Sequence, residues 1–260
     1  MRFIRYQTDS TPAGFGWILD TPEGAFVGPI DGSPLGEFRR LDADVPLENV
    51  RLLAPVRPGK IICIGRNYVA HAKEHEVEVP EVPLLFLKPP SAVIGPGENI
   101  VLPPQSQRIE HEAEMVVVIG KKGRWIPIDE ALDYVLGYTI GNDVTARDLQ
   151  RRDGQWTRGK GFDTFCPIGP WILTDFDPAD AMLTCYVNGE MRQMASTRDM
   201  VFSVRQLIAF ASSVMTLEPG DLLFTGSPAG VGPLLPGDTV EVNIEGLGSL
   251  RNPVVEEPVR

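Results

Sequence analysis

The stretch that most constrains this chain is IEHEAEMVVVIG, residues 109–120. From Met115 onward it is an apolar, β-branched run that ends at Gly120, which predicts a buried strand followed by a turn. Just before the run, Glu112 and Glu114 are two residues apart, so on a strand both side chains point to the same face. Two adjacent carboxylates that enter an apolar environment repel each other and lose hydration, and a divalent cation offsets both costs. The ordinary alternative for such a pattern is a solvated strand edge with an acidic fringe.

A third carboxylate stands where another predicted strand ends. Asp143 closes GYTIGND, residues 137–143, where apolar and small residues give way to polar ones. Alone, an aspartate before a helical turn is more often an N-cap than a ligand. Together with Glu112 and Glu114 it describes a site with only oxygen donors. Such a site favours Mg²⁺ or Mn²⁺, allows Ca²⁺, and disfavours Zn²⁺, which prefers nitrogen and sulfur ligands.

Composition limits the class of protein. With 260 residues, 43% of them hydrophobic and 23% charged, the chain resembles an ordinary soluble globular protein. A net charge of −11 without a basic block argues against nucleic acid or an anionic membrane as partner. No apolar run reaches the length of a membrane span, and MRFIRYQTDS lacks the apolar segment of a signal peptide. Cys63, Cys166 and Cys185 are far apart and odd in number, so a cytoplasmic, reducing setting is expected.

Glycine and proline divide the chain into many short elements. Residues 1–55 hold short alternating segments and predict a small N-terminal β-rich domain, followed by a larger domain at 56–260. The fold class is α+β with more strand than helix. The other expected elements are helices at 66–79, 129–136 (with Asp129 as N-cap), 145–152 and 202–217, a loop at 153–165, and a hairpin turn at Asn188-Gly189.

His71 and Glu74 form a second candidate group. At positions i and i+3 of a helix their side chains are neighbours, and a carboxylate in contact with an imidazole orients it and raises its basicity. Such a pair can activate water near neutral pH. The alternative is a polar surface helix with one histidine and a solvated glutamate. His75 and His111 are competing histidines, but on a strand His111 would face away from Glu112 and is expected to be structural.

Two further segments contain candidate ligand contacts. Lys160 lies in TRGKGFD between glycines that let the backbone approach a ligand, so its cation could bind a carboxylate or stabilise an enolate. A lone lysine is otherwise a solvated side chain. After an apolar strand, Thr225-Gly226-Ser227-Pro228 forms a turn that either holds an anion or is a plain hairpin loop. No helix of suitable pattern follows, so no nucleotide cofactor is expected.

Seven segments, taken in order, resemble the fumarylacetoacetate hydrolase family. They are GRNYVAHAKE (65–74), LFLKPPSAV (85–93), IEHEAEMVVVIGK (109–121), GYTIGNDVTARDLQ (137–150), KGFDTFCPIGPW (160–171), VNGEMRQ (187–193) and LLFTGSPAGVG (222–232). The resemblance covers about residues 56–255 and implies a mixed β-roll, usually assembled as a homodimer, in a catalytic domain at 56–260. The N-terminal unit resembles the small β domain of many bacterial members.

The resemblance implies roles for the two candidate groups. Glu112, Glu114 and Asp143 match the three carboxylates that hold Mg²⁺ or Mn²⁺ in the family. His71 and Glu74 match the dyad that family members of the acylpyruvate-hydrolase and oxaloacetate-decarboxylase type carry.

Five more positions match residues near the metal and the substrate. Lys160 matches the lysine beside the metal, and Gln150 matches a polar substrate contact. Thr225, with Gly226, matches the loop that closes around the carboxylate end of the substrate, and Arg66 is assigned to substrate binding as well.

The implied function is a metal-dependent enzyme acting on a small 2-oxo acid or its enol through a metal-bound enolate. The intact His71–Glu74 dyad favours C–C hydrolysis of an acylpyruvate, or decarboxylation as for oxaloacetate. The alternative is isomerisation of 2-hydroxyhepta-2,4-diene-1,7-dioate in aromatic catabolism. Gly161 is a departure, since the family often has serine there. A hypothesis from another class is a non-catalytic protein whose acidic cluster binds Ca²⁺.

Overall fold

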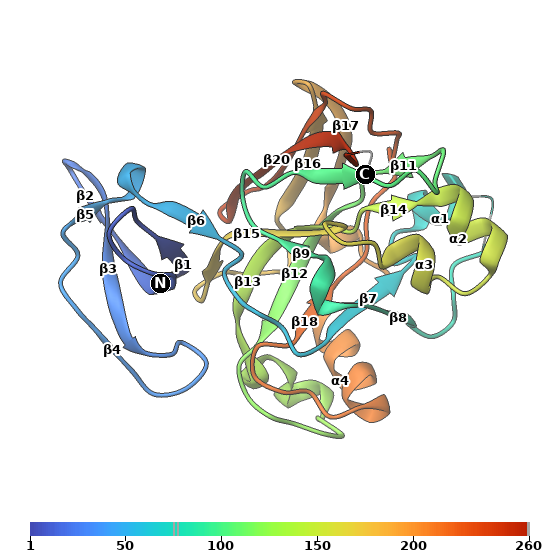
Figure 1. Cartoon of the computed structure of the whole chain (residues 1–260). Helices are drawn as coiled ribbons and strands as arrows, with labels where there is room; N and C mark the ends of the chain where they lie inside the picture. Colours follow the sequence, from blue (N-terminus) through green and yellow to red (C-terminus); the bar gives the residue numbers. More distant parts are fainter. Residues whose placement is uncertain (75, 77, 259–260) are drawn as a thin grey trace.

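Strands dominate the computed structural model, which describes residues 1–74, 76 and 78–258 (Figure 1). A 13-stranded sheet runs in the order β4-β3-β2-β1-β15-β13-β12-β18-β7-β8, with β5 paired to β3, β6 to β1 and β9 to β15. Its strands are β1 (Arg2–Gln7), β2 (Gly14–Thr21), β3 (Gly24–Gly32), β4 (Phe38–Arg40), β5 (Val45–Pro46), β6 (Arg51–Leu53), β7 (Ile61–Gly65), β8 (Leu84–Lys88), β9 (Val93–Ile94), β12 (Ala113–Ile119), β13 (Val135–Asn142), β15 (Cys166–Leu173) and β18 (Leu222–Phe224).

A five-stranded sheet packs on the first one, and a two-stranded ribbon completes the strand set. The five-stranded order is β10 (Ile100–Leu102), β20 (Gly248–Glu256), β19 (Thr239–Ile244), β16 (Met182–Val187) and β17 (Glu190–Ser196). The ribbon pairs β11 (Ile109–Glu110) with β14 (Thr145–Ala146). Asn188 and Gly189 both have positive φ between β16 and β17, so the predicted hairpin turn is confirmed.

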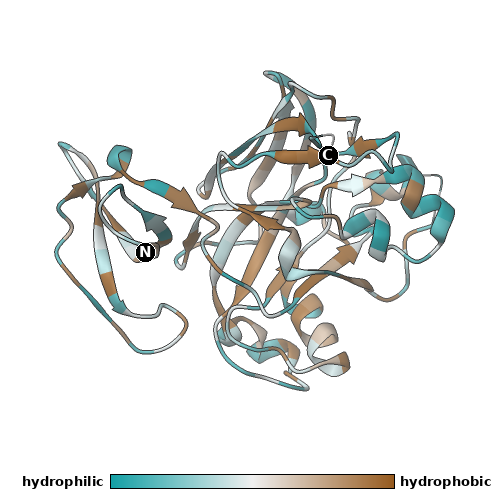
Figure 2. Ribbon diagram, in the orientation of Figure 1, coloured by the Kyte–Doolittle hydropathy of each residue, from teal (hydrophilic) through white to brown (hydrophobic). Residues whose placement is uncertain are grey.

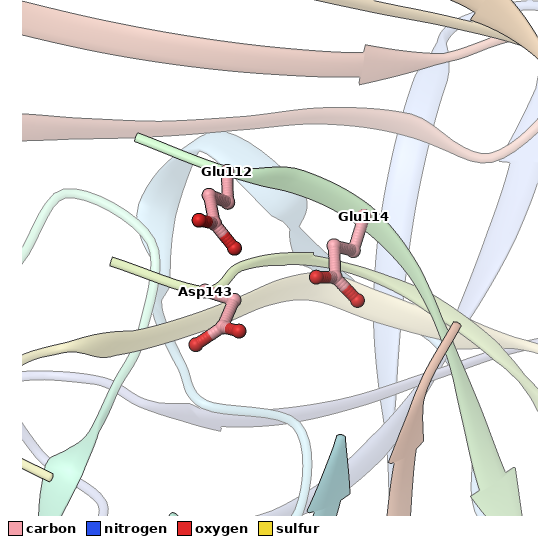
Figure 3. A group of neighbouring side chains, drawn as sticks. All are labelled: Glu112, Glu114 and Asp143. Carbon is pink, nitrogen blue, oxygen red and sulfur yellow. The ribbon is translucent and has the colours of Figure 1, made fainter. Parts of the chain in front are cut away.

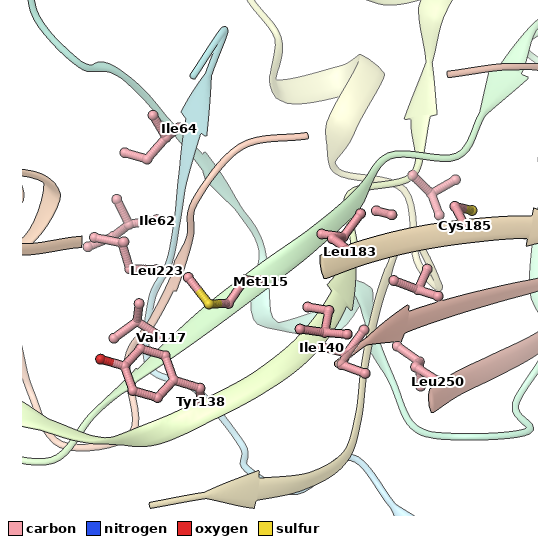
Figure 4. Close-up of a cluster of buried hydrophobic side chains, with 14 of the residues drawn as sticks. Ile62, Ile64, Met115, Val117, Tyr138, Ile140, Leu183, Cys185, Leu223 and Leu250 are labelled. Atoms are coloured by element: carbon pink, nitrogen blue, oxygen red, sulfur yellow. The ribbon is translucent and has the colours of Figure 1, made fainter. Parts of the chain in front are cut away.

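Strand β12 is buried on both faces. Met115 and Val117 pack into the core cluster that also contains Leu183 and Cys185 of the five-stranded sheet (Figure 4). Residues 116 and 118 pack into a second core on the opposite face. This two-sided burial explains the continuous apolar run, because a strand covered on both faces has no polar side. The hydropathy colouring agrees, since the central strands are hydrophobic while α2 is largely hydrophilic (Figure 2).

Helices are few and short. They are α1 (Val69–Glu74), α2 (Arg147–Asp153), α3 (Thr157–Lys160), α4 (Val204–Val214) and the 3₁₀ turns η1 (Leu47–Asn49), η2 (Pro90–Ala92), η3 (Ile128–Tyr134) and η4 (Thr197–Asp199). No helix in the described ranges has the length and apolar character needed to cross a bilayer. The β-rich α+β class predicted from the sequence is confirmed.

Three local predictions are wrong in detail. The helix expected at 129–136 is the 3₁₀ turn η3, whose N-cap is Pro127 rather than Asp129, because residues 135 and 136 already belong to β13. The helix expected at 66–79 begins only at Val69, after Arg66 with its positive φ of 61°; α1 is described over Val69–Glu74, and residues 75 and 77 of the expected helix lie outside the described residues. The loop expected at 153–165 contains α3.

The N-terminal strands extend the large sheet. β1 pairs with β15, placing Phe3 opposite Ile172. The same unit has a small core of its own, built from Ile4, Tyr6, Ile18 and Val27. A domain boundary at residues 55/56 stays a prediction.

Candidate active site

Three carboxylates meet where β12 and β13 pair. Glu112 precedes β12, Glu114 is its second residue, and Asp143 directly follows β13. The register places Glu114 opposite Gly141, and the Asp143 N–H donates to the Glu112 carbonyl at 2.8 Å. One oxygen from each carboxylate lies within 4.8 Å of the others, and all three side chains point to the same space (Figure 3). All three residues are buried, so a solvated acidic fringe is ruled out.

Buried cations surround the carboxylates. Lys160 Nζ bridges Glu112 Oε2 at 2.7 Å and Asp143 Oδ2 at 2.6 Å. Lys88 Nζ donates to Asp143 Oδ1 at 2.6 Å, and the Arg147 guanidinium pairs with Glu112. Lys160 is 2% exposed, so it is not the solvated side chain that a lone lysine would ordinarily be. Each cation compensates carboxylate charge that water cannot reach.

The pKa values of Glu112 and Glu114 are shifted in opposite directions. Burial alone would raise the pKa of Glu112, but Lys160 and Arg147 outweigh it and hold that pKa well below its usual range. For Glu114, burial and then the charges of Asp143 and Glu112 raise the pKa well above its usual range. A cation at this position would relieve that repulsion. The site therefore fits a hard divalent ion with oxygen ligands, held by Glu112, Glu114 and Asp143.

His71 and Glu74 lie at one side of the same pocket. His71 Nδ1 is 3.2 Å from Glu74 Oε2, and Glu74 also accepts the Gly230 N–H at 3.0 Å. Burial lowers the pKa of His71, and the negative charge of Glu112 opposes this effect only in part. The imidazole ring is therefore neutral near pH 7. A neutral imidazole can accept a proton, which is what a general base requires. The competing His75 lies outside the described residues.

A cavity of about 620 Å³ joins Glu112 and Asp143 to the His71–Glu74 dyad. Its lining residues are Ile64, Gly65, Arg66, His71, Glu74, Glu76, Phe86, Glu112, Asp143, Arg147, Gln150, Arg151, Gly154, Trp156, Lys160 and Ser227. The size and the convergence of charged groups suit a small polar ligand.

The expected substrate contacts lie in two places. Gln150 and Arg66 line the cavity, and Gln150 Oε1 accepts from Arg147 at 2.6 Å. Thr225 and Gly226 do not line it: the Thr225 hydroxyl donates to the Met115 carbonyl at 2.8 Å. The Gly226 N–H donates to a carboxylate oxygen of Glu114 at 2.7 Å, so this turn supports a proposed metal ligand. Substrate roles for these four residues stay predictions.

Comparison with known proteins decides the family. Residues 60–255 match the family described as fumarylacetoacetate (FAA) hydrolase C-terminal, and residues 1–55 match the one described as Rv2993c-like, N-terminal. The chain belongs to the fumarylacetoacetate hydrolase family. This confirms the resemblance seen in the sequence.

Relatives within the fumarylacetoacetate hydrolase family extend over most of the chain. Protein Rv2993c of Mycobacterium tuberculosis is 46% identical over 92% of this chain and 97% of its own length. The mitochondrial oxaloacetate tautomerase Fahd2a of Rattus norvegicus is 47% identical over 84% of this chain and 74% of its own length. The crystal structure of 2-hydroxyhepta-2,4-diene-1,7-dioate isomerase from Mycobacterium marinum covers 100% of both chains with a TM-score of 0.91 and 44% identity.

Sequence reasoning missed two buried cations of this fumarylacetoacetate hydrolase family site. Lys88 ends the apolar strand β8, and Arg147 begins α2. A charged residue that closes an apolar strand was the available signal for Lys88, whose partner Asp143 is 55 positions away. Arg147 was hidden because its partners, Glu110 and Glu112, lie on another element.

The remaining histidine is structural in its contacts. His111 is fully buried, with Nδ1 2.9 Å from Gln193 Oε1 and 3.5 Å from the Cys185 sulfur. These partners belong to β16 and β17 of the five-stranded sheet. His111 therefore contacts the core, as expected of a structural residue, although it lies between β11 and β12 rather than on a strand.

Proposed function

We propose that this chain is a divalent-metal-dependent enzyme that acts on small 2-oxo acids or their enols. The observation that supports it is the cluster of three buried carboxylates beside Lys160, in which Glu112, Asp143 and Lys160 line one cavity. Mg²⁺ or Mn²⁺, held by Glu112, Glu114 and Asp143, would supply a Lewis acid for negative charge that develops at the 2-oxo oxygen.

The charge balance of the site supports a dianionic ligand. Three carboxylates, Glu110, Glu112 and Asp143, form a network of ion pairs with Lys88, Arg108, Arg147 and Lys160, and Glu114 lies beside them as the fourth acidic group. With all of them ionised the network is neutral, so a divalent ion leaves two positive charges. A 2-oxo acid in its enolate form carries a carboxylate and an oxyanion and would balance them.

Three side chains have separate roles in the proposed reaction. Lys160 stabilises negative charge at the 2-oxo oxygen. His71, neutral because burial lowers its pKa, accepts a proton from the substrate in enol–keto exchange or from water in hydrolysis. Glu74 orients the ring through the contact at Nδ1.

Enol–keto isomerisation is the reaction we place first. The names of the relatives support it, since they include an oxaloacetate tautomerase and a 2-hydroxyhepta-2,4-diene-1,7-dioate isomerase. Hydrolysis of a C–C bond is the second candidate, because the His71–Glu74 pair has the arrangement that activates water. Decarboxylation, which needs only stabilisation of the enolate, is the third candidate.

The wall of the cavity favours a substrate tail that ends in a carboxylate. Lys160 Nζ lies 5.0 Å from the Phe86 ring centroid, and Phe86 lies 5.1 Å from the Trp156 ring. The guanidinium carbon of Arg66 is 5.9 Å from the Trp156 ring. An apolar surface thus leads from Lys160 to Arg66, where a distal carboxylate would find a cation.

Two other expectations join the proposal. We propose a homodimer and a cytoplasmic setting on the family resemblance and on the three free cysteines Cys63, Cys166 and Cys185. Light scattering after size exclusion tests the oligomer directly.

Thermal shift with Mg²⁺ or Mn²⁺, with and without oxalate, tests the proposal against a structural calcium site. An enzyme of this type gains stability from metal and gains more from oxalate, which mimics the enolate, as ligand linkage requires. A structural calcium site responds to metal alone. A panel of acylpyruvates, oxaloacetate and hydroxy-dienedioates, followed by loss of enol absorbance, then identifies the reaction.

A further inference from the structure

Gln193, in strand β17 of the five-stranded sheet, makes four side-chain hydrogen bonds while 1% exposed. Its Oε1 accepts from the Ala113 N–H at 3.1 Å and lies 2.9 Å from His111 Nδ1. Its Nε2 donates to the Ser227 hydroxyl and to the Pro228 carbonyl, both at 2.8 Å. One amide therefore joins the strand that carries the carboxylates to the turn at residues 225–228.

The orientation of this amide is fixed by its partners. The Ala113 N–H can only donate, so it requires the amide oxygen on its side, and the Pro228 carbonyl can only accept. Because Oε1 is an acceptor, His111 must carry its proton on Nδ1. A side chain that satisfies all four bonds in one orientation cannot rotate without burying unpaired groups.

The turn also contacts both halves of the candidate site. Gly226 donates its N–H to Glu114, one of the proposed metal ligands, at 2.7 Å. Gly230 donates its N–H to Glu74 of the dyad at 3.0 Å. The turn and the residues that follow it thus lie between the carboxylates and the dyad, and hold one residue of each.

Strand β17 supports this segment along its length. A Cβ at Gly230 would lie 2.0 Å from the Arg192 carbonyl, so the loop rests directly on the strand. The Gly232 carbonyl accepts a hydrogen bond from the backbone N–H of His111 at 3.2 Å. The segment 226–232 is therefore fixed between β17 and β12, which belong to different sheets. Gln193, on β17, is the side chain that bonds both to this segment and to β12.

We propose that Gln193 is a positioning residue for the reaction, which sets the segment 226–230 and through it the placement of Glu114 relative to the His71–Glu74 dyad. This inference rests on the proposed function. Gln193 does not line the cavity, so its effect passes through Ala113, which lies between two proposed ligands, and through the turn at Gly226, Ser227 and Gly230. Residues that orient metal ligands without touching the metal themselves change the metal affinity when they are mutated.

Gln193→Met tests the proposal, because methionine has a similar volume and no amide. Mn²⁺ affinity by electron paramagnetic resonance, and oxalate affinity by calorimetry in the presence of Mn²⁺, should each fall by about 10- to 100-fold. Gln206→Met is the matched control. Gln206 accepts the Ser203 N–H at the start of α4, so its loss should lower Tm while both affinities stay within about twofold of wild type.

The coupling through the loop gives a second readout. With Mn²⁺ saturating in every variant, Gln193→Met should reduce kcat much less in a His71→Ala background than in wild type, because the dyad that it helps to place is already lost. A purely structural role predicts equal reductions in both backgrounds. Full additivity would therefore overturn the proposal.

The remaining outcomes are also decisive. If wild type binds Mn²⁺ and oxalate and Gln193→Met binds them equally well, the positioning role is wrong while the proposed function stands. If wild type binds neither, the proposed function itself fails. Should Gln193→Met not fold, Gln193→Glu keeps the acceptor for Ala113 and loses both donors, and Ser227→Ala removes one bond. Both should weaken oxalate binding, and wild-type affinity in both would contradict the proposal.

Discussion

The two ends of the cavity are carried by different kinds of secondary structure. The carboxylate end rests on β12 and β13, strands of seven and eight residues paired along their length, and its acidic side chains are buried. The dyad end rests on α1, a helix of six residues, where the Glu74 side chain is 31% exposed and accepts the Gly230 N–H.

This difference separates charge binding from proton transfer. A paired sheet fixes the positions of charges before any ligand arrives, so little reorganisation is needed when a substrate oxyanion develops. A short helix that begins after a residue with positive φ, Arg66, has fewer backbone hydrogen bonds to neighbouring elements than a paired strand has. We expect changes at the strand end to abolish function and changes at the helix end to alter which reaction is catalysed.

The largest effect is expected for Asp143→Ala. It removes one of three oxygen ligands and leaves Lys88 and Lys160 without their shared partner, so metal binding is lost. Loss of a Lewis acid worth several kcal/mol predicts a fall in kcat/KM of about 10³-fold or more. Calorimetry with Mn²⁺ and steady-state kinetics check it, with exposed Asp163→Ala as control. Retained Mn²⁺ affinity would remove the basis for the metal site.

Lys160→Met should have the next largest effect and separates the lysine from the metal. Without Lys160, Glu112 and Asp143 lose a shared cation, so Mn²⁺ affinity should be retained or increased. Catalysis should still fall by about 10²- to 10³-fold, because a donor to the developing oxyanion is gone. Parallel loss of metal and activity would instead mean that Lys160 only supports the carboxylates.

The same two ends show what sequence reasoning reaches. The carboxylate trio was predictable because Glu112 and Glu114 are close in sequence beside the start of a buried strand, and because Asp143 stands at the end of another. The cation network was not, since Lys88 meets Asp143 across 55 positions and Arg147 meets Glu112 across 35. Such pairs depend on sheet order, which local periodicity does not specify.

Boundaries of short elements were the other failure. The start of β13 at Val135 cuts off the end of the helix expected at 129–136, and the remaining element is a 3₁₀ turn. On α4, which is shorter than the helix expected at 202–217, Val204, Leu207, Ile208 and Ala211 are buried whereas Val214 is 52% exposed. The sheet that each helix packs on decides its buried face.

His71→Ala should divide the possible reactions. Loss of a general base costs about 10²- to 10⁴-fold in hydrolysis of an acylpyruvate, whereas decarboxylation of oxaloacetate, which relies on enolate stabilisation, should change far less. The two rates are measured on the same preparation with Mn²⁺ present. An equal loss of both activities would show that the dyad does not act separately from the carboxylate end.

The smallest effect is expected in the pH profile, and it concerns the dyad alone. Burial lowers the pKa of His71 below its usual 6.5, and the Glu74 contact partly opposes that. A neutral base is active, so kcat/KM should stay constant above 6.5 and decline only as pH drops through the lowered pKa. Glu74→Gln keeps a hydrogen-bonding group but removes the charge that favours the imidazolium, so the midpoint should move further down. An unchanged or higher midpoint in Glu74→Gln would mean that another group titrates, and that the helix end takes no part in proton transfer.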